Sequence, residues 1–362
     1  MLIGIDGRYA EGDLVGVGKY IHFLIRALAK RDIECLLFYS RKPKFKIQGE
    51  NVRSIILPAP NRYYFEQVAL PFALNKYKVD LYHAMGNIGV PLFCSVPAIL
   101  TIHDLIPLEI GDYFCYSPAS FLSKLSYNLR LRSSLFKADK IVAVSKYTKE
   151  QLFKKLHISS NKIRVIYSGP TSLKDGGKLP TKLVGMKYVL NHGGIDIRKN
   201  IHRLIEAFAS VHINHTEIKL VITGENKIMQ EKLNDLIAKL KLGSFVIFTG
   251  YVDDKTLTTI IKKAILICYP TLSEGFGFPV LEGFGAGIPV ISSNVSAIPE
   301  IAGEAALLIN PESPDSISKA IEKILSNPRL VNSMISKGKR TYNKFNWEKS
   351  ADEYIDLYNS IK

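Results

Sequence analysis

The sequence predicts an α/β protein of two domains, each built on a parallel β-sheet with helices on both faces. The chain has 362 residues, which is more than one ordinary hydrophobic core needs and suits two domains. In both halves, short apolar segments alternate with helix-forming segments, as in parallel sheets. Residues 169–186, rich in Gly, Pro and Lys, interrupt this alternation and predict the linker between the domains.

The first domain, residues 1–168, opens with an apolar strand at residues 2–6. A loop that runs from Gly7 to Gly18 follows, and then a helix at about residues 19–30, where apolar residues recur at helical spacing. The other strands expected in this domain are residues 34–39, 80–83, 98–102 and 140–144.

The second domain, residues 187–346, repeats the pattern. We expect helices at 201–210 and from residue 280. Its expected strands are residues 188–192, 219–223, 245–249, 265–269, 289–292 and 306–309. The last segment, residues 347–362, is amphipathic, and we expect it to form a helix that packs back across the domain seam.

Composition places the chain among globular proteins, with 47% hydrophobic and 22% charged residues. It has no apolar run long enough for a transmembrane helix, and its N-terminus is a strand pattern instead of a signal peptide. The four cysteines are widely spaced, which predicts reduced thiols in a cytoplasmic protein. They are Cys35, Cys94, Cys115 and Cys268.

Positive charge is concentrated in the first half of the chain. The net charge is +15; residues 1–168 have 24 Lys and Arg against 13 Asp and Glu, or +11, which leaves +4 for the remainder. A basic half of this kind predicts binding to a polyanion, either nucleic acid or an anionic membrane surface. A merely soluble basic protein is an equal alternative. No zinc spacing, aromatic RNA-binding strand or helix-turn-helix pattern supports nucleic acid.

Two acids eight positions apart flank a glycine-rich turn. Glu274 precedes Gly275, Phe276 and Gly277, and Glu282 lies about one turn into the helix that follows. Backbone N–H groups at such a helix start favour an anion. An anion site between two carboxylates suits a nucleotide sugar, which carries both phosphates and hydroxyls. For an isolated pair of acids, two solvated carboxylates would be the better interpretation.

Arg198 and Lys199 stand just before the helix expected at 201–210, where the helix dipole disfavours cations. A diphosphate bridging them would resolve the conflict, because Arg offers a bidentate fork and Lys a point charge. The alternative is a solvated basic turn.

Other candidate residues also follow expected strands, where doubly wound sheets bind ligands. Gly16 and Gly18 would let a ligand approach the backbone, although a flexible loop explains them equally well. His103 could hydrogen-bond a sugar hydroxyl, or Asp104 or the backbone could satisfy it. Tyr251 could frame a base, or be an ordinary packed tyrosine.

Taken together, these residues resemble glycosyltransferase family 4, retaining enzymes of the GT-B fold. The resemblance covers nearly the whole chain, and the acid pair matches the family's E-x7-E signature. The matching elements, in order, are residues 16–18, 103–104, 144–148, 165–169, 194–200, 249–251 and 273–282. The resemblance implies two Rossmann-like domains facing across a cleft, with an acceptor site in the first and a nucleotide-sugar site in the second.

The resemblance also implies roles. Glu282 would bind the ribose hydroxyls, and Arg198 and Lys199 the diphosphate, in place of a metal ion. Glu274 would contact the donor sugar near the reacting carbon, and the amides of residues 275–277 the sugar and phosphate. His103 would touch the sugar, and Gly16 and Gly18 would approach the phosphate. No metal or other cofactor is implied.

Within the family, residues 292–300 look similar to enzymes that use GDP-mannose in bacterial surface-polysaccharide synthesis, such as O-antigen. A glycan or lipid-linked acceptor follows, and Tyr63, Tyr64 and Phe65 with the basic residues 41–46 would suit peripheral contact with an anionic membrane. The chain departs from the family in the glycines at 283, 285 and 287, which would either allow closer approach of another backbone or simply mark drift. A nonhydrolysing nucleotide-sugar epimerase and a noncatalytic basic binding protein are the alternatives.

Overall fold

A computed structural model describes residues 1–47, 49–110 and 120–361. The chain forms two compact units. The first consists of Met1–Gly169 together with Phe345–Lys362, and the second is Pro170–Lys344. Each is an α/β unit, which confirms the predicted fold class.

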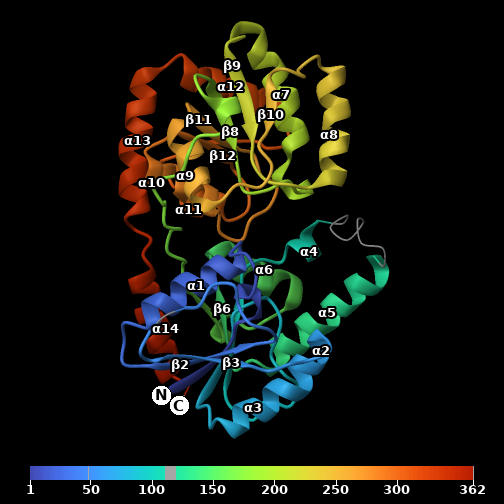
Figure 1. Ribbon diagram of the computed structural model, residues 1–362, viewed down its shortest axis with the longest axis vertical. Helices are drawn as coiled ribbons and strands as arrows, with labels where there is room; N and C mark the ends of the chain where they lie inside the picture. The colour runs from blue at the N-terminus through green and yellow to red at the C-terminus, as the bar shows by residue number, and fades with distance from the viewer. Residues whose placement is uncertain (48, 111–119, 362) are drawn as a thin grey trace. The chain divides into compact units, whose positions relative to one another are not determined.

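The first unit contains a seven-stranded parallel sheet in the order β3-β2-β1-β4-β5-β6-β7. Figure 1 labels β2, β3 and β6 of this sheet. Its strands are β1 (Leu2–Asp6), β2 (Glu34–Tyr39), β3 (Val52–Ile56), β4 (Leu81–Ala84), β5 (Ala98–Ile102), β6 (Lys140–Ala143) and β7 (Ile163–Val165). The chain leaves β1 in one direction through β2 and β3 and then continues on the other side through β4. The carboxyl ends of β1 and β4 therefore form a topological switch point, where doubly wound sheets bind ligands.

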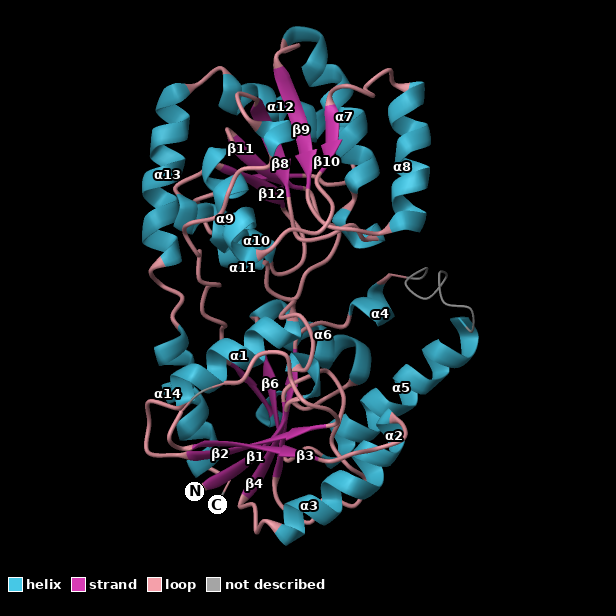
Figure 2. Ribbon diagram, in the orientation of Figure 1, coloured by secondary structure: helices cyan, strands magenta, loops and turns pink. Residues whose placement is uncertain are grey.

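Helices cover both faces of this sheet (Figure 2). They are α1 (Val17–Leu28), α2 (Arg62–Tyr64), α3 (Leu70–Lys76), α4 (Ile106–Glu109), α5 (Ser120–Lys137), α6 (Lys146–Leu156) and α14 (Trp347–Asn359). A π-helical turn, η2 (Phe65–Ala69), joins α2 to α3 without a break. Short 3₁₀ turns form at η1 (Arg8–Ala10) and η3 (Ser160–Lys162).

The C-terminal helix α14 belongs to the first unit and packs on α1. The hydroxyl of Tyr354 hydrogen-bonds that of Tyr20 and lies 3.1 Å from Thr101 Oγ1, so α14 is tied to α1 and β5 by buried polar contacts. Trp347 stacks on Phe23 with ring centroids 6.0 Å apart. The amphipathic pattern of the final segment therefore reflects a buried helix face.

The second unit contains a six-stranded parallel sheet in the order β10-β9-β8-β11-β12-β13. Its strands are β8 (Lys187–Asn191), β9 (Ile218–Ile222), β10 (Val246–Phe248), β11 (Leu266–Tyr269), β12 (Val290–Ser293) and β13 (Leu307–Ile309). Its helices are α7 (Ile201–Asn214), α8 (Lys227–Lys239), α9 (Asp254–Lys263), α10 (Phe278–Ala286), α11 (Ile298–Ala302), α12 (Pro314–Leu325) and α13 (Pro328–Tyr342), with 3₁₀ turns η4 (Thr181–Leu183) and η5 (Ile197–Lys199). The switch point of this sheet lies between β8 and β11.

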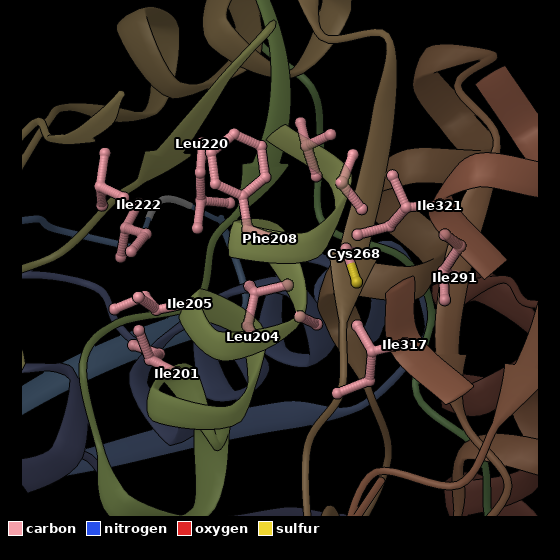
Figure 3. Packing of buried hydrophobic residues seen from close by; sticks show 14 of the residues in the cluster. Ile201, Leu204, Ile205, Phe208, Leu220, Ile222, Cys268, Ile291, Ile317 and Ile321 are labelled. Atoms are coloured by element: carbon pink, nitrogen blue, oxygen red, sulfur yellow. The ribbon is translucent and has the colours of Figure 1, made fainter. Parts of the chain in front are cut away.

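Alternate residues of each strand in this unit point to opposite faces. Leu220, Cys268 and Ile291 meet α7 and α12 on one face, in the cluster drawn in Figure 3. Ile267 and Val290 face the other way and meet α10. Both faces are thus covered, which explains why the strands are continuously apolar.

The segment expected as a linker is irregular but held in place. The backbone amide of Lys174 donates to Thr258 Oγ1 at 3.0 Å, and Thr259 Oγ1 donates to the Gly177 carbonyl at 3.0 Å. Both threonines belong to α9, so residues 174–177 lie along that helix in the second unit. A Cβ at Gly177 would stand 2.2 Å from the Lys255 backbone, which explains a glycine there.

Candidate active site

The candidate site of the second unit lies at the carboxyl ends of β8 and β11. The loop after β8 leads through η5 into α7, and the loop after β11 leads into α10. The carbonyl of Arg198 joins the two loops, because it accepts from the Leu272 amide at 2.7 Å and from Thr271 Oγ1 at 3.0 Å. Asn200, in the left-handed conformation at φ 58°, donates to the carbonyls of Pro270 and Pro311. The two loops are therefore one structure.

Glu274 accepts four hydrogen bonds on its Oε1 atom. The donors are the Arg198 guanidinium, Lys199 Nζ at 2.7 Å, the Tyr269 hydroxyl at 2.5 Å and Thr271 Oγ1 at 3.2 Å. Burial raises the pKa of this carboxyl, but the charges of Lys199 and Arg198 outweigh burial and bring the pKa to about 2. Glu274 is therefore ionised at neutral pH.

Lys199 is almost fully enclosed, with 3% of its surface exposed. Its Nζ contacts the Tyr269 hydroxyl and lies 4.7 Å from the centroid of the same ring. Burial lowers the pKa of Lys199, while the charge of Glu274 opposes that shift. Asp196 Oδ1 also lies 3.9 Å from Arg198 Nε, so two cations and two carboxylates meet in this cluster. Arg198 and Lys199 were expected to need a diphosphate as their counter-ion, but in the structure they share the carboxylate of Glu274.

The glycine-rich turn passes directly into α10. Gly277 caps that helix with φ 109°, and Pro279 stands in its first turn. A Cβ at Gly277 would lie 2.8 Å from Ile298 Cδ1, so the turn is closely packed. The ring of Phe276 is buried next to Phe278, with centroids 5.2 Å apart. The predicted turn and helix are confirmed, and the helix N-terminus faces the loop that carries Glu274.

Glu282 lies within α10 and is 7% exposed. Its Oε1 accepts a hydrogen bond of 2.5 Å from Thr171, and its Oε2 lies 2.9 Å from His192 Nε2. It is therefore held in position and is not a solvated helix-start acid.

His192, directly after β8, was not predicted as a site residue. Its side chain is fully buried, and within the described residues neither ring nitrogen makes an angularly aligned hydrogen bond, despite the short distance to Glu282. The sequence signal that could have identified His192 is its position between an expected strand and the pair Gly193-Gly194. In the structure these two glycines adopt φ values of 108° and 92°.

The two glycines within α10 are required by packing, and the one that follows the helix is required by the backbone conformation. A Cβ at Gly283 would lie 2.6 Å from Val290 Cγ2, and one at Gly285 would lie 2.6 Å from the Tyr342 ring. Gly287 ends the helix at φ 72°. The expected approach of another backbone is wrong for Gly283 and Gly285, because their close neighbours are side chains.

Tyr251 is 63% exposed, so the interpretation as an ordinary packed tyrosine is wrong. It follows Gly250, which adopts φ 74° and accepts a backbone hydrogen bond of 3.0 Å from Gly224. Gly224 in turn would place a Cβ only 2.6 Å from the Gly194 Cα. The ends of β8, β9 and β10 are thereby held together.

In the first unit, His103 follows β5. Its Nε2 donates to the Met85 carbonyl at 2.8 Å, its backbone amide donates to Asn87 Oδ1 at 2.7 Å, and its ring meets Tyr20 edge-on. Burial lowers the pKa of His103 to about 4, although the Met85 carbonyl opposes the shift. The ring is therefore neutral at pH 7, with Nδ1 as an acceptor.

Gly16 and Gly18 begin α1 but differ in their surroundings. Gly16 is exposed, adopts φ 47° and has open space around it. Gly18 is buried, and a Cβ there would lie 2.5 Å from the Tyr9 carbonyl oxygen. Position 18 thus requires a glycine because of packing inside the unit, whereas the backbone of Gly16 is exposed at the surface.

Phe65, expected on a membrane-facing surface, is fully buried beneath the Arg8 guanidinium, so that expectation is wrong for this residue. Cys35 and Cys268 are buried thiols whose pKa burial raises, Cys94 is partly buried, and Cys115 lies outside the described residues.

Two further searches concern metals and membranes. Among the described residues, no three His, Cys, Asp or Glu side chains gather as ligands for a metal ion. In the same part of the chain, no helix is both long and apolar enough to span a bilayer.

Two doubly wound domains with a basic, glycine-rich site at the switch point of the second define a glycosyltransferase of the GT-B fold. The family model "Glycosyltransferase Family 4" matches residues 15–170, and "Glycosyl transferases group 1" matches residues 180–341. The chain belongs to glycosyltransferase family 4.

Relatives and solved structures agree with this assignment. The chain is 26% identical to the O-antigen chain mannosyltransferase B of Escherichia coli, over 95% of this chain and 96% of the relative. Its fold is similar to a sucrose-phosphate synthase of Thermosynechococcus elongatus, with a TM-score of 0.79, 21% identity, and 99% and 98% of the two chains covered. The lipopolysaccharide-biosynthesis glycosyltransferase WaaG matches with a TM-score of 0.75 at 17% identity, over 99% of both chains.

Proposed function

We propose that this glycosyltransferase transfers a hexose, with mannose favoured, from a nucleoside diphosphate sugar to a hydroxyl of a glycan or lipid-linked acceptor in cell-surface polysaccharide synthesis. The observation that carries the proposal is the cluster of Arg198, Lys199 and Glu274 beside the N-terminus of α10. It joins two cationic side chains to an ionised carboxylate. A diphosphate would use the first, and a developing sugar cation the second.

The reaction replaces one bond at the anomeric carbon with another. The bond from that carbon to the phosphate oxygen breaks as the acceptor oxygen bonds to the same carbon. The departing phosphate oxygen takes the proton of the acceptor hydroxyl, so no side-chain base is required. Attack on the face that the phosphate leaves would retain the anomeric configuration. Arg198, Lys199 and the N–H groups at the start of α10 would stabilise the leaving diphosphate.

Glu274 is better suited to electrostatic stabilisation than to covalent attack. Its pKa of about 2 and four donors on one oxygen reduce its nucleophilicity, while its negative charge would favour an oxocarbenium-like sugar. We assign the ribose hydroxyls to Glu282, whose Oε1 accepts a hydrogen bond from Thr171 and whose Oε2 lies 2.9 Å from His192 Nε2.

The E. coli relative, named as an O-antigen mannosyltransferase, supports mannose, and HepE of Anabaena, solved with UDP-glucose, shows a nucleotide sugar on this fold at 15% identity. We assign no metal to the reaction, because the cations of the cluster would occupy its role at the diphosphate.

The test is a thermal-shift panel of nucleotide sugars, with and without EDTA, on the wild type, Glu282→Gln and the control Glu304→Gln. Glu304 is an exposed acid of the same unit, paired only with Lys337 in a surface contact. One donor should stabilise the wild type by about 2.7 kcal/mol at a hundredfold excess over Kd, and the control equally. Glu282→Gln should lose most of this shift, and EDTA should change nothing.

The bound donor is then incubated with candidate acceptors, and the anomeric configuration of the product is read by NMR. Retention supports the proposal and inversion contradicts it. Conversion of the donor alone into another nucleotide sugar would indicate an epimerase instead. Absence of a shift with every donor would contradict the assigned site.

A further inference from the structure

His192 is a buried histidine whose cost to the fold has no counterpart in its hydrogen bonds. It stands one residue beyond β8, and its side chain has no exposed surface. Among the residues that the structure describes, neither Nδ1 nor Nε2 has a hydrogen-bond partner of good geometry. An imidazole that loses its contacts with water and gains none in the protein lowers stability. A native residue of this kind is a candidate for a role in ligand binding.

The ring of His192 lies against the carboxylate of Glu282. Nε2 is 2.9 Å from Oε2, while the other carboxylate oxygen, Oε1, accepts the hydroxyl proton of Thr171 at 2.5 Å. The distance between Nε2 and Oε2 suits a hydrogen bond, and only the angle does not. A small rotation of the carboxylate would therefore align the two groups.

A similar contact occurs at the other acid of the pair. The hydroxyl of Tyr269, the last residue of β11, donates to Glu274 Oε1 at 2.5 Å. Strands β8 and β11 are neighbours in the sheet, so His192 and Tyr269 extend from adjacent strand ends. Each of the two acids thus has one side chain from the end of a strand in contact with its carboxylate.

The backbone after His192 leads to the cations assigned to the diphosphate. A Cβ at Gly193 would lie 3.1 Å from Pro279 Cγ and 3.5 Å from Lys199 Nζ. This turn is therefore close both to the first turn of α10 and to the basic cluster. In a nucleoside diphosphate the ribose is joined to the phosphates through a single carbon. A residue between Glu282 and Lys199 is thus well placed to act on ribose binding.

We propose that His192 is a positioning residue for the ribose of the donor. In the complex its Nε2–H donates to Glu282 Oε2 and fixes the plane of the carboxylate, so that Glu282 accepts the ribose hydroxyls in one orientation. A charge-assisted hydrogen bond of this kind is stronger than one between neutral groups. The inference rests on the proposed function, because it takes Glu282 as the ribose ligand. It adds the residue that governs discrimination between ribose and deoxyribose.

The experiment measures dissociation constants by calorimetry for GDP, UDP and ADP and for their 2′-deoxy and 3′-deoxy forms. The test variant His192→Leu removes both ring nitrogens, and His192→Gln restores an N–H donor. The matched control is His215→Leu. His215 lies at the C-terminal end of α7, and its Nε2 is likewise 2.8 Å from a glutamate oxygen, Oε2 of Glu322.

We expect the wild type to bind one ribonucleotide about tenfold or more tightly than its deoxy forms, as for hydroxyls bound by a charged group. His192→Leu should reduce this ratio to about threefold or less by weakening the ribonucleotide alone. His192→Gln and His215→Leu should keep most of the ratio. Added to Glu282→Gln, His192→Leu should change the ratio no further, because it acts through that carboxylate.

A purely structural role of His192 would weaken the ribo and deoxy forms equally. That result, or an unchanged ratio in His192→Leu, would overturn the inference and leave the proposed function intact. A wild type that binds none of the ribonucleotides, or does not distinguish them from the deoxy forms, would contradict the assignment of Glu282 and the inference with it. If His192→Leu does not fold, His192→Asn, whose amide is too short to reach Oε2, is compared with His192→Gln in the same way.

Discussion

Lys199 and Glu274 form a buried ion pair that joins the loop after β8 to the loop after β11, with Nζ 2.7 Å from Oε1. The pair brings together residues 75 positions apart in the sequence. Lys199 is placed by the 3₁₀ turn η5, which Asp196 caps by accepting the Arg198 amide, and Glu274 is placed by the turn before α10. The local geometry of two separate loops thus sets the charge of the site.

Replacing Glu274 with Gln should destabilise the protein. The change removes the carboxylate that Arg198 and the buried Lys199 share, so we expect a loss of about 3 kcal/mol in the free energy of unfolding. Urea denaturation measures it. Adding Lys199→Met to this variant should recover part of the loss; strictly additive effects of the two changes would show that the pair is not coupled.

Thr171→Val should weaken the position of Glu282. Removal of the hydroxyl leaves a buried carboxylate oxygen without its 2.5 Å donor, at an expected cost of about 2 kcal/mol in unfolding free energy. The control is Thr256→Val. The hydroxyl of Thr256 donates to the exposed Asp253, so its removal should cost less unfolding free energy. Equal losses of unfolding free energy in the two variants, measured by urea denaturation, would show that the contact between Thr171 and Glu282 is no stronger than an exposed one. We also expect weaker donor binding, by calorimetry, only in the Thr171 variant.

Gly283→Ala should destabilise α10 even though alanine favours helices. The new methyl group would stand 2.6 Å from Val290 and 2.8 Å from Ile267, both fully buried, so overpacking should cost about 1–3 kcal/mol. Gly243→Ala, which meets open space, serves as the control and should change stability by less than about 0.5 kcal/mol. Denaturant midpoints of the two variants compare the effects; a stable Gly283 variant would contradict the packing explanation.

The stability of the first unit should fall with acid because of His83. Burial, with a smaller effect of His103, lowers the pKa of His83 to about 3, and its ring nitrogens hydrogen-bond Tyr358 and Thr101 at 2.8 Å. The unfolded chain takes up a proton below about pH 6.5, which the folded chain does not. The contribution of neutral His83 to the free energy of unfolding is therefore complete above pH 6.5 and is lost progressively as the pH falls toward 3.

Between pH 6.5 and 5 this loss amounts to about 2 kcal/mol. His83→Gln, measured by urea denaturation at both pH values, should show a correspondingly smaller decrease. The control is His157→Asn, an exposed histidine in the left-handed conformation that Asn tolerates. A decrease as large in His83→Gln as in the wild type would exclude His83 as its source.

In the seven-stranded sheet the central strands were predictable and the two edge strands were not, whereas both edge strands of the six-stranded sheet were predicted. The strands at 34–39 and 98–102 coincide with β2 and β5, because a strand covered on both faces is a continuous apolar run. The strands β3 and β7 were missed. Each lies at an edge of the seven-stranded sheet, and β3 is buried only at Val52. These two strands carry no comparable run and form because a neighbouring strand supplies their hydrogen bonds.

The sequence by itself determined the alternation of strands and helices, the glycine turn before α10 and the position of Glu282 in that helix, because these depend on neighbouring residues. Only the tertiary structure turned Arg198 and Lys199 toward Glu274, placed His192 against Glu282 and buried Phe65 under Arg8. It also returned α14 to the first unit. These features depend on which strands are neighbours in a sheet, and pairing of distant segments leaves no local pattern in the chain.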